Sequence, residues 1–172
     1  MYNYIVYGLK IKSDIEIKEF IKIENENNDI DIVLGQAPDE IKSMISKGSR
    51  SSYSKTKVWF HIDDVATYYI VDGTTILVDP CENHDETLLR VYLMCSCLGF
   101  IMLQREQVAI HGGVINIDGN AVIFTGDRGA GKSTLTTALR NKGYQFISDD
   151  VAALEMKNNI PMVKHGFPYQ KL

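Results

Sequence analysis

The most informative stretch of this sequence is Gly126-Asp127-Arg128-Gly129-Ala130-Gly131-Lys132-Ser133. It fits the pattern G-x-x-x-x-G-K-[ST], in which small residues let successive backbone N–H groups converge on a phosphate. The helix that follows such a loop points the positive end of its dipole at the same anion. We therefore expect Lys132 to reach the β- and γ-phosphates of a nucleotide and the Ser133 hydroxyl to bind Mg²⁺.

The segments on both sides of this loop support the assignment. Residues 121–125 form a short apolar run typical of a strand, and residues 133–142 are typical of a helix that Gly143 ends. Leu135, Ala138 and Leu139 are expected on one apolar face of that helix. The predicted nucleotide contacts are Gly126, Asp127, Arg128, Gly129, Ala130, Gly131, Lys132, Ser133 and Thr134.

Composition restricts the class of protein. The chain has 172 residues, is 45% hydrophobic and 23% charged, and carries a net charge of −4, so we expect no nucleic-acid-binding surface. The N-terminus lacks the basic and apolar regions of a secretion signal. The longest apolar run, 91–103, is shorter than a membrane-spanning helix and contains Ser96 and Gly99. Three cysteines without metal-ligand spacing suggest reduced thiols, so the expected location is the cytoplasm.

The first 85 residues are predicted to form a small β-rich domain. Alternating apolar residues predict strands at 2–11, 29–34, 58–62, 66–71 and 74–78, and Asp72-Gly73 predicts a tight hairpin turn within 66–79. A short helix should begin near Pro38, with Ile41, Met44 and Ile45 as its apolar stripe. No set of residues in this part is typical of catalysis.

The second predicted domain comprises residues 86–172. Residues 86–104 predict a buried helix that packs on the later segments of this domain. A strand is expected at 107–110, leading into His111-Gly112-Gly113 and continuing at 114–117. Another is expected at 145–148, and the chain after Val151 should be largely extended.

Two adjacent acids, Asp149 and Asp150, follow the strand 145–148. Beside a phosphate-binding loop, one carboxylate can hold Mg²⁺ and the other can accept the proton of an attacking hydroxyl. A solvated turn is the alternative explanation for two acids after a strand. His111, taken alone, is more typical of a structural histidine at a strand end.

Together these residues resemble a known family. His111-Gly112-Gly113, the loop 126–133 and Ser148-Asp149-Asp150 look like the C-terminal kinase domain of HPr kinase/phosphorylase, whose nucleotide-binding core is shared with the phosphoenolpyruvate carboxykinases. Residues 7–11 and 31–35 more weakly resemble the first domain of HPr-kinase-related proteins, including lasso-peptide kinases. The fold that the resemblance implies is α/β (α+β), with a P-loop core preceded by a small β-rich domain.

The resemblance also implies roles for single residues. Asp149 would be the base that activates a serine hydroxyl, with His111 as its partner, Lys132 on the phosphates, and Ser133 and Asp150 near the metal. The roles of Asp149 and Asp150 could be exchanged. The implied activity is an ATP- and Mg²⁺-dependent serine kinase that acts on a protein or peptide, without a nucleic acid or membrane partner.

Two departures from the family pattern leave alternatives open. Arg128 stands where the family usually has a small hydroxyl residue, and the chain stops at Leu172, where relatives continue with further strands and a metal-binding carboxylate. We therefore expect a domain that is incomplete at its C-terminus, or one completed by another copy or a separate chain. Val151, Ala153, Leu154, Ile160 and Val163 are the apolar residues expected to lie uncovered. The alternatives to a kinase are a nucleotide-binding module without catalysis and a small-molecule phosphotransferase.

Overall fold

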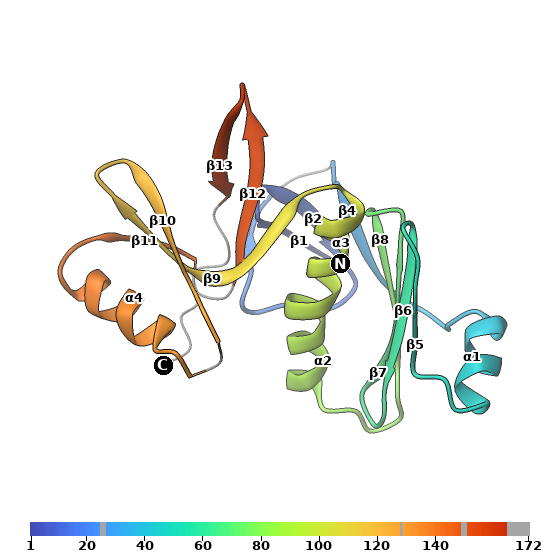
Figure 1. Cartoon of the computed structure of the whole chain (residues 1–172). Coiled ribbons are helices and arrows are strands. Elements are labelled where there is room, and N and C mark those ends of the chain that lie inside the picture. The colour runs from blue at the N-terminus through green and yellow to red at the C-terminus, as the bar shows by residue number, and fades with distance from the viewer. Residues whose placement is uncertain (25–26, 128, 149–150, 165–172) are drawn as a thin grey trace. The chain divides into compact units, whose positions relative to one another are not determined.

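The computed structural model describes residues 1–24, 27–127, 129–148 and 151–164 of the chain (Figure 1). These residues form two compact units. The first comprises Met1–Tyr4, Leu9–Ile17 and Lys22–Glu106, and the second comprises Ile5–Gly8, Lys18–Ile21 and the chain from Gln107 onward. The architecture is mixed α/β, with two sheets and few helices.

An eight-stranded sheet organises the first part of the chain, in the order β3-β1-β2-β4-β8-β7-β6-β5. β4 runs parallel to both β2 and β8, whereas β5 to β8 form antiparallel pairs. The strands are β1 (Tyr2–Val6), β2 (Leu9–Ser13), β3 (Ile21–Lys22), β4 (Ile30–Leu34), β5 (Ser51–Tyr53), β6 (Lys57–Ile62), β7 (Ala66–Val71) and β8 (Thr75–Pro80).

Turn chemistry explains two features of this sheet. The hairpin predicted for 66–79 is confirmed, and both central residues of its turn have the positive φ that a type I′ turn needs, 52° at Asp72 and 66° at Gly73. The single strand predicted for 2–11 is wrong, because the chain turns at Tyr7 and Gly8, whose φ angles are 52° and 74°. A glycine in an otherwise strand-like run is the sequence signal for that break.

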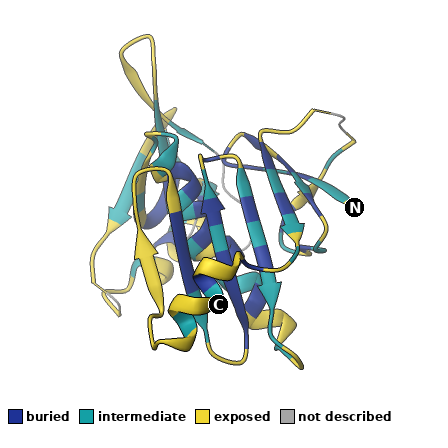
Figure 2. Ribbon diagram, turned by 90° about the vertical axis from the view of Figure 1, so that its right-hand side faces the viewer, coloured by how far each residue is buried: buried dark blue, intermediate teal, exposed yellow. Residues whose placement is uncertain are grey.

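Helices cover both faces of the sheet. Trp59 and Phe60 are neighbours on β6 and therefore point to opposite faces. Trp59 packs in a cluster with Ile41 of α1 (Asp39–Ser46), while the Phe60 ring lies 6.3 Å from the ring of Tyr92. Figure 2 shows the result: the central strands are largely buried, whereas the edge strand β5 is exposed throughout.

The helix predicted for 86–104 is present as α2 (Glu86–Tyr92), a π-helical turn η1 (Leu93–Cys97) and α3 (Leu98–Gln104). It packs on the eight-stranded sheet, as the buried hydrogen bond of 3.1 Å from the Tyr68 hydroxyl of β7 to the Leu89 carbonyl shows. The compact unit consequently ends after Glu106, whereas the sequence placed the boundary at 85/86.

The same helical stretch is long and apolar enough to cross a membrane by length and composition, with 19 residues and a mean hydropathy of 1.6. The apolar run 91–103 is shorter than this stretch, and its length alone predicts no membrane-spanning helix. A core helix passes the same test, and the buried contact of Leu89 shows the core role in this chain.

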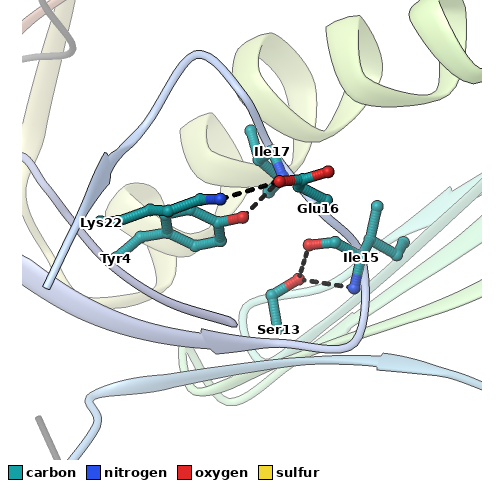
Figure 3. A network of polar contacts seen from close by, with 6 residues as sticks. All are labelled: Tyr4, Ser13, Ile15, Glu16, Ile17 and Lys22. Atoms are coloured by element: carbon teal, nitrogen blue, oxygen red, sulfur yellow. Dashed lines mark hydrogen bonds and ion pairs between the residues drawn. The ribbon is translucent and has the colours of Figure 1, made fainter. Parts of the chain in front are cut away.

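A polar network holds the segment after β2 (Figure 3). The fully buried Tyr4 hydroxyl accepts a hydrogen bond of 2.8 Å from the backbone N–H of Ile17. The Ser13 hydroxyl donates to the Ile15 carbonyl at 2.8 Å and accepts from the same residue's N–H at 3.0 Å. An ion pair of 2.8 Å joins the exposed side chains Lys22 and Glu16 and raises the pKa of the lysine.

The second unit contains a five-stranded sheet in the order β10-β9-β12-β13, with β11 also paired to β9. One helix, α4 (Lys132–Asn141), follows the glycine-rich loop. The strands are β9 (Val108–Ile117), β10 (Asn120–Thr125), β11 (Gln145–Ser148), β12 (Val151–Lys157) and β13 (Ile160–Lys164). The strand predicted at 107–110 and its predicted continuation at 114–117 are present as β9, which runs through the glycine pair.

Candidate active site

Strand β9 is the element on which the candidate site is built. Along one edge it pairs with β10, from Ile117 opposite Asn120 to Gly112 opposite Thr125. Residues 114–116 of β9 also pair with β11, and residues 108–111 pair with β12, the strand that follows β11 in the chain. The loop that starts at Gly126 therefore begins where β10 ends, beside the middle of β9.

The glycine-rich loop has the backbone conformation for which its glycines are needed. The φ angles are 154° at Gly126, 84° at Gly129 and 83° at Gly131, values that L side chains rarely adopt. Gly131 caps helix α4, which begins at Lys132. A Cβ at Gly129 or Gly131 would meet no atom within 4 Å, so the loop has open space beside it.

Lys132 bends back over the loop. Its ammonium donates hydrogen bonds to the carbonyl of Gly126 at 2.8 Å and to that of Asp127 at 3.0 Å. The Ala130 N–H donates to the Asp127 carbonyl at 3.1 Å and tightens the same turn. The cation is therefore held beside the backbone of the loop. Ser133 and Thr134 follow it at the exposed start of α4.

The glycine pair in β9 sets how closely the loop's helix approaches the sheet. A Cβ on Gly113 would lie 2.5 Å from Cγ2 of Thr136, and a Cβ on Gly112 would lie 2.6 Å from the Phe124 carbonyl oxygen. Thr136 is fully buried, and its hydroxyl donates to the Ser133 carbonyl at 3.1 Å. Thr136 therefore contacts both the sheet, at Gly113, and the backbone of Ser133, the residue expected to bind the metal.

This contact corrects the predicted orientation of the helix. The sequence suggested that Leu135, Ala138 and Leu139 form the packed face, but Thr136 is the buried residue of α4 and Leu135 is 44% exposed. A glycine on the facing strand lets a small β-branched side chain approach, and a larger apolar residue has no room there. Hydrophobic periodicity alone could not reveal that choice.

His111 lies on β9 directly before the glycine pair. Its carbonyl accepts a hydrogen bond of 3.0 Å from the Thr125 hydroxyl, so the strand is tied to the last residue before the loop. His111 itself is exposed and pairs with Val151.

The described ends of β11 and β12 lie next to the same part of β9. Ser148 pairs with Val114, and its hydroxyl donates to the Val151 carbonyl at 2.7 Å. The register of β11 shifts between Phe146 and Ser148, as at a β-bulge. Asp149 and Asp150, which complete the predicted catalytic set, and Arg128 of the loop lie outside the described residues.

The described residues of the loop and of the start of α4 fit a phosphate group. Positive φ angles at the loop glycines, a helix N-terminus at Lys132 and a lysine ammonium beside the loop are the features that cradle phosphates. Among the described residues, no three His, Cys, Asp or Glu side chains gather as a metal site of their own.

Sequence reasoning missed Gly113, Thr136 and Thr125 as supporting residues. The pair Gly112-Gly113 was the sequence feature that could have indicated them, because glycine inside a strand often marks the close approach of another segment. Which segment approaches depends on the register of β10 against β9, which the sequence does not give.

Comparison with known proteins relates this chain to one group. No protein-family model matches it. The HPr kinase/phosphorylase of Pediococcus pentosaceus is 30% identical over 122 residues, which cover 64% of this chain and 39% of that protein. The HPr kinase/phosphorylase of Bordetella pertussis is 30% identical over 116 residues, covering 61% of this chain and 36% of that protein.

Among solved structures, the Hpr(Ser) kinase/phosphatase of Coxiella burnetii matches 33% of this chain and 34% of its own chain, with 36% identity and a TM-score of 0.31. This chain thus spans less than half the length of the curated relatives it matches. At about 30% identity to several such enzymes, it is related to the HPr kinase/phosphorylases.

Proposed function

We propose that this chain is an ATP-dependent serine kinase of the HPr-kinase-like type, which transfers the γ-phosphate to a serine of a protein or peptide. The observation that carries the proposal is the register of β9. It brings His111, the start of the loop after Thr125, and the described ends Ser148 and Val151 to one part of one sheet. The relatives support the same class of activity, since their names describe kinases.

The loop residues bind and orient the nucleotide in this proposal. The backbone N–H groups from Gly126 to Gly131 and the N-terminus of α4 hold the phosphates. Lys132 exchanges its two carbonyl contacts for β- and γ-phosphate oxygens, and Ser133 ligates Mg²⁺ together with Asp150. ATP supplies the phosphoryl group, and a Mg²⁺ ion held by these residues would offset the negative charge of the phosphates.

Asp149 and His111 act on the acceptor. Asp149 accepts the proton of the serine hydroxyl while the serine oxygen bonds to the γ-phosphorus. The bond from that phosphorus to the β–γ bridging oxygen breaks, and the products are phosphoserine and ADP. His111 holds the Asp149 carboxylate in position. The two acids exchange roles if Asp150 is the one nearer the hydroxyl.

The proposed setting is the cytoplasm, where ATP and Mg²⁺ are available and thiols stay reduced. Cys81, Cys95 and Cys97 form no disulfide in the described part of the chain. The proposed partner is a serine-containing protein or peptide, with neither nucleic acid nor membrane. Another copy of the chain or a separate chain is a proposed complement, because Ile160 of β13 is 59% exposed.

A second candidate is a nucleotide-binding module without catalysis of its own. The observation in its favour is that the proposed phosphate contacts lie in the loop and at the start of α4, so nucleotide binding does not itself require transfer. Such a module would bind Mg-ATP through the loop without transferring phosphate.

One pair of measurements tests both candidates. Calorimetry measures Mg-ATP binding to the full chain, and γ-³²P-ATP reports transfer to purified HPr and to the proteins of a dephosphorylated cell extract. Binding with label on a serine supports the kinase, and binding without any transfer supports the module. No Mg-ATP binding would overturn both.

A further inference from the structure

A pocket of about 190 Å³ lies in the first unit, between helix α1 and the edge of the eight-stranded sheet. Trp59 and Tyr69 sit directly opposite each other on β6 and β7 and form its aromatic wall. Ile41 and Met44 of α1 contribute the facing apolar side, and Lys57 lines the pocket at the start of β6.

Several polar groups of this pocket have no partner within the described part of the chain. The Trp59 indole N–H, the Tyr69 hydroxyl and the Ser52 hydroxyl make no hydrogen bond there, and the Lys57 ammonium makes no ion pair. Trp59 is only 5% exposed, so its N–H is set in a mostly buried ring. Ser52 and Lys57 are exposed and Tyr69 is half-buried, so these groups are open to solvent and available to a ligand.

The strand beside the pocket has an open edge. In the sheet order β5 is the last strand and pairs with β6 alone. Arg50 and Ser54 direct their backbone hydrogen bonds toward β6, through His61 N–H to Arg50 O at 2.8 Å and Ser54 N–H to Lys57 O at 2.8 Å. Alternation along an antiparallel strand then directs the N–H and C=O of Ser51 and Tyr53 outward.

Charge favours an acidic occupant beside Lys57. The net charge of the chain is −4, yet the segment 47–57 contains no acidic residue and four basic ones, Lys47, Arg50, Lys55 and Lys57. Arg50 pairs with Asp63 and Lys55 with Glu106, which leaves Lys47 and Lys57 without an ion pair among the described residues, while Glu40 also lines the pocket. An acidic group is the complement of the two unpaired lysines, because opposite charges steer encounter and favour the bound register.

We propose that β5 and the pocket beside α1 form a docking site for an extended acidic peptide, which adds to the sheet as a further strand. Its backbone pairs with the outward groups of Ser51 and Tyr53. A residue on the same face as Ser52 places a bulky apolar side chain between Trp59 and Met44, and flanking carboxylates meet Lys57. The site is separate from the glycine-rich loop and does not depend on phosphate transfer.

Trp59 makes the test direct, because it is the only tryptophan in the chain. A displayed library of random dodecapeptides is selected against the full chain, and one enriched peptide is synthesised and titrated while Trp59 fluorescence is followed. The expected result is enrichment of peptides with Asp or Glu around a bulky apolar residue, together with a saturable change in Trp59 emission.

Two matched pairs of variants examine the backbone and charge contacts. Ser51→Pro removes an outward N–H without touching the bonds to β6, whereas Ser51→Ala keeps that N–H. Ser51→Pro should weaken binding about fivefold or more, the effect of one lost hydrogen bond, and Ser51→Ala should bind normally. Lys57→Glu should weaken binding by at least as much, whereas Lys10→Glu on β2, with the same change of net charge, should not.

Thermal unfolding of each variant shows whether it is folded, and Lys57→Glu tests the site independently if Ser51→Pro fails to fold. Equal binding by both members of each folded pair would overturn the proposal. So would a library that yields no acidic peptide. A wild-type dimer that Ser51→Pro makes monomeric, with no peptide enriched, would instead assign the edge to a second copy of this chain.

Discussion

The two sheets of this chain treat apolar side chains in different ways. In the eight-stranded sheet the central strands β7 and β8 bury one face completely, as Tyr68, Ile70, Ile76 and Val78 are all 0% exposed. The second sheet leaves large apolar side chains in contact with solvent on three of its strands: Val108 of β9 is 57% exposed, Met156 of β12 68%, and Ile160 and Met162 of β13 59% and 45%.

That difference suggests that the first sheet mainly determines stability and the second mainly determines activity. Burial of apolar area stabilises a fold by about 25 cal/mol per Å², so the first sheet should dominate the stability of the described chain. The second sheet carries the glycine-rich loop and the proposed catalytic residues on a less covered framework. Changes in the second unit should therefore alter activity strongly and stability weakly, and changes in the first should do the reverse.

The largest expected effect is on catalysis in the second unit. Asp149→Asn keeps the size of the side chain and removes the proton acceptor, so turnover should fall on the order of 10²-fold or more. Nucleotide affinity and the unfolding temperature should stay close to those of the unchanged chain. Phosphate transfer and Mg-ATP calorimetry on the same preparations measure both. A loss of Mg-ATP binding would make Asp149 a structural or metal residue instead.

His111→Ala should act in the same direction more mildly. A histidine that holds the base contributes less than the base itself, so turnover should drop while nucleotide affinity is kept. An unchanged rate would return His111 to a structural role, in which its carbonyl bond to Thr125 is the relevant contact.

Lys132→Ala should reduce nucleotide binding. The change removes a charge-assisted contact to phosphate, worth about 1.5–3 kcal/mol, so calorimetry should show affinity lower by about tenfold or more. Lys142→Ala, beyond the far end of the same helix, is the control and should bind normally. Equal affinity in the two variants would contradict the phosphate-binding role of the loop.

The sequence predicted the elements of the second unit better than their packing. The loop motif, the strand 145–148 and the extended chain after Val151 are present as predicted. Ala153, expected to lie uncovered, is only 2% exposed, on a strand that pairs with β9 and with β13. Alternation shows that a residue lies on a strand but does not show which strand will cover it.

The same limit explains the boundary and the site. The helix 86–104 was predicted correctly, but its periodicity could not tell which sheet it would cover. His111 became part of a site only through the register that pairs Gly112 with Thr125. Long-range register is a property of the folded sheet, and local sequence records it only where a turn or a glycine fixes it.

Gly113→Ala should be an exception among changes in the second unit, because it alters packing and should therefore lower stability as well as activity. The added methyl would lie 2.5 Å from Cγ2 of Thr136, and such overpacking typically destabilises by about 1–3 kcal/mol. Unfolding temperature and Mg-ATP affinity should both fall, since α4 carries Lys132 and Ser133. Adding Thr136→Ser removes the clashing methyl and keeps the hydroxyl, so the double variant should recover most of both losses.

That rescue distinguishes a steric contact from a general weakness of β9. If Gly113→Ala and Thr136→Ser were simply additive, the close approach would not be what positions the helix. The single variant Thr136→Ser is the control, because it leaves the glycine and the hydroxyl in place.

The smallest expected effect is in the first unit. Tyr68→Phe removes the buried hydrogen bond to the Leu89 carbonyl, which also accepts a bond from the Leu93 N–H, so no acceptor is left without a donor. Stability should fall by about 0.5–1.5 kcal/mol, with unchanged Mg-ATP affinity. Tyr53→Phe, at an exposed tyrosine whose hydroxyl has no partner among the described residues, should leave both unchanged.

Alkaline pH gives this last prediction a second signature. Burial raises the pKa of Tyr68 far above its usual value, so the native state keeps this proton when the unfolded chain loses it. The stabilisation is complete below the unfolded pKa of about 10 and declines as pH rises above it. Chemical denaturation at about pH 8 and about pH 11 should therefore show a smaller loss of stability in Tyr68→Phe than in the unchanged chain. An equal loss would mean that other groups control alkaline unfolding and that the Tyr68 hydroxyl contributes little to the first core.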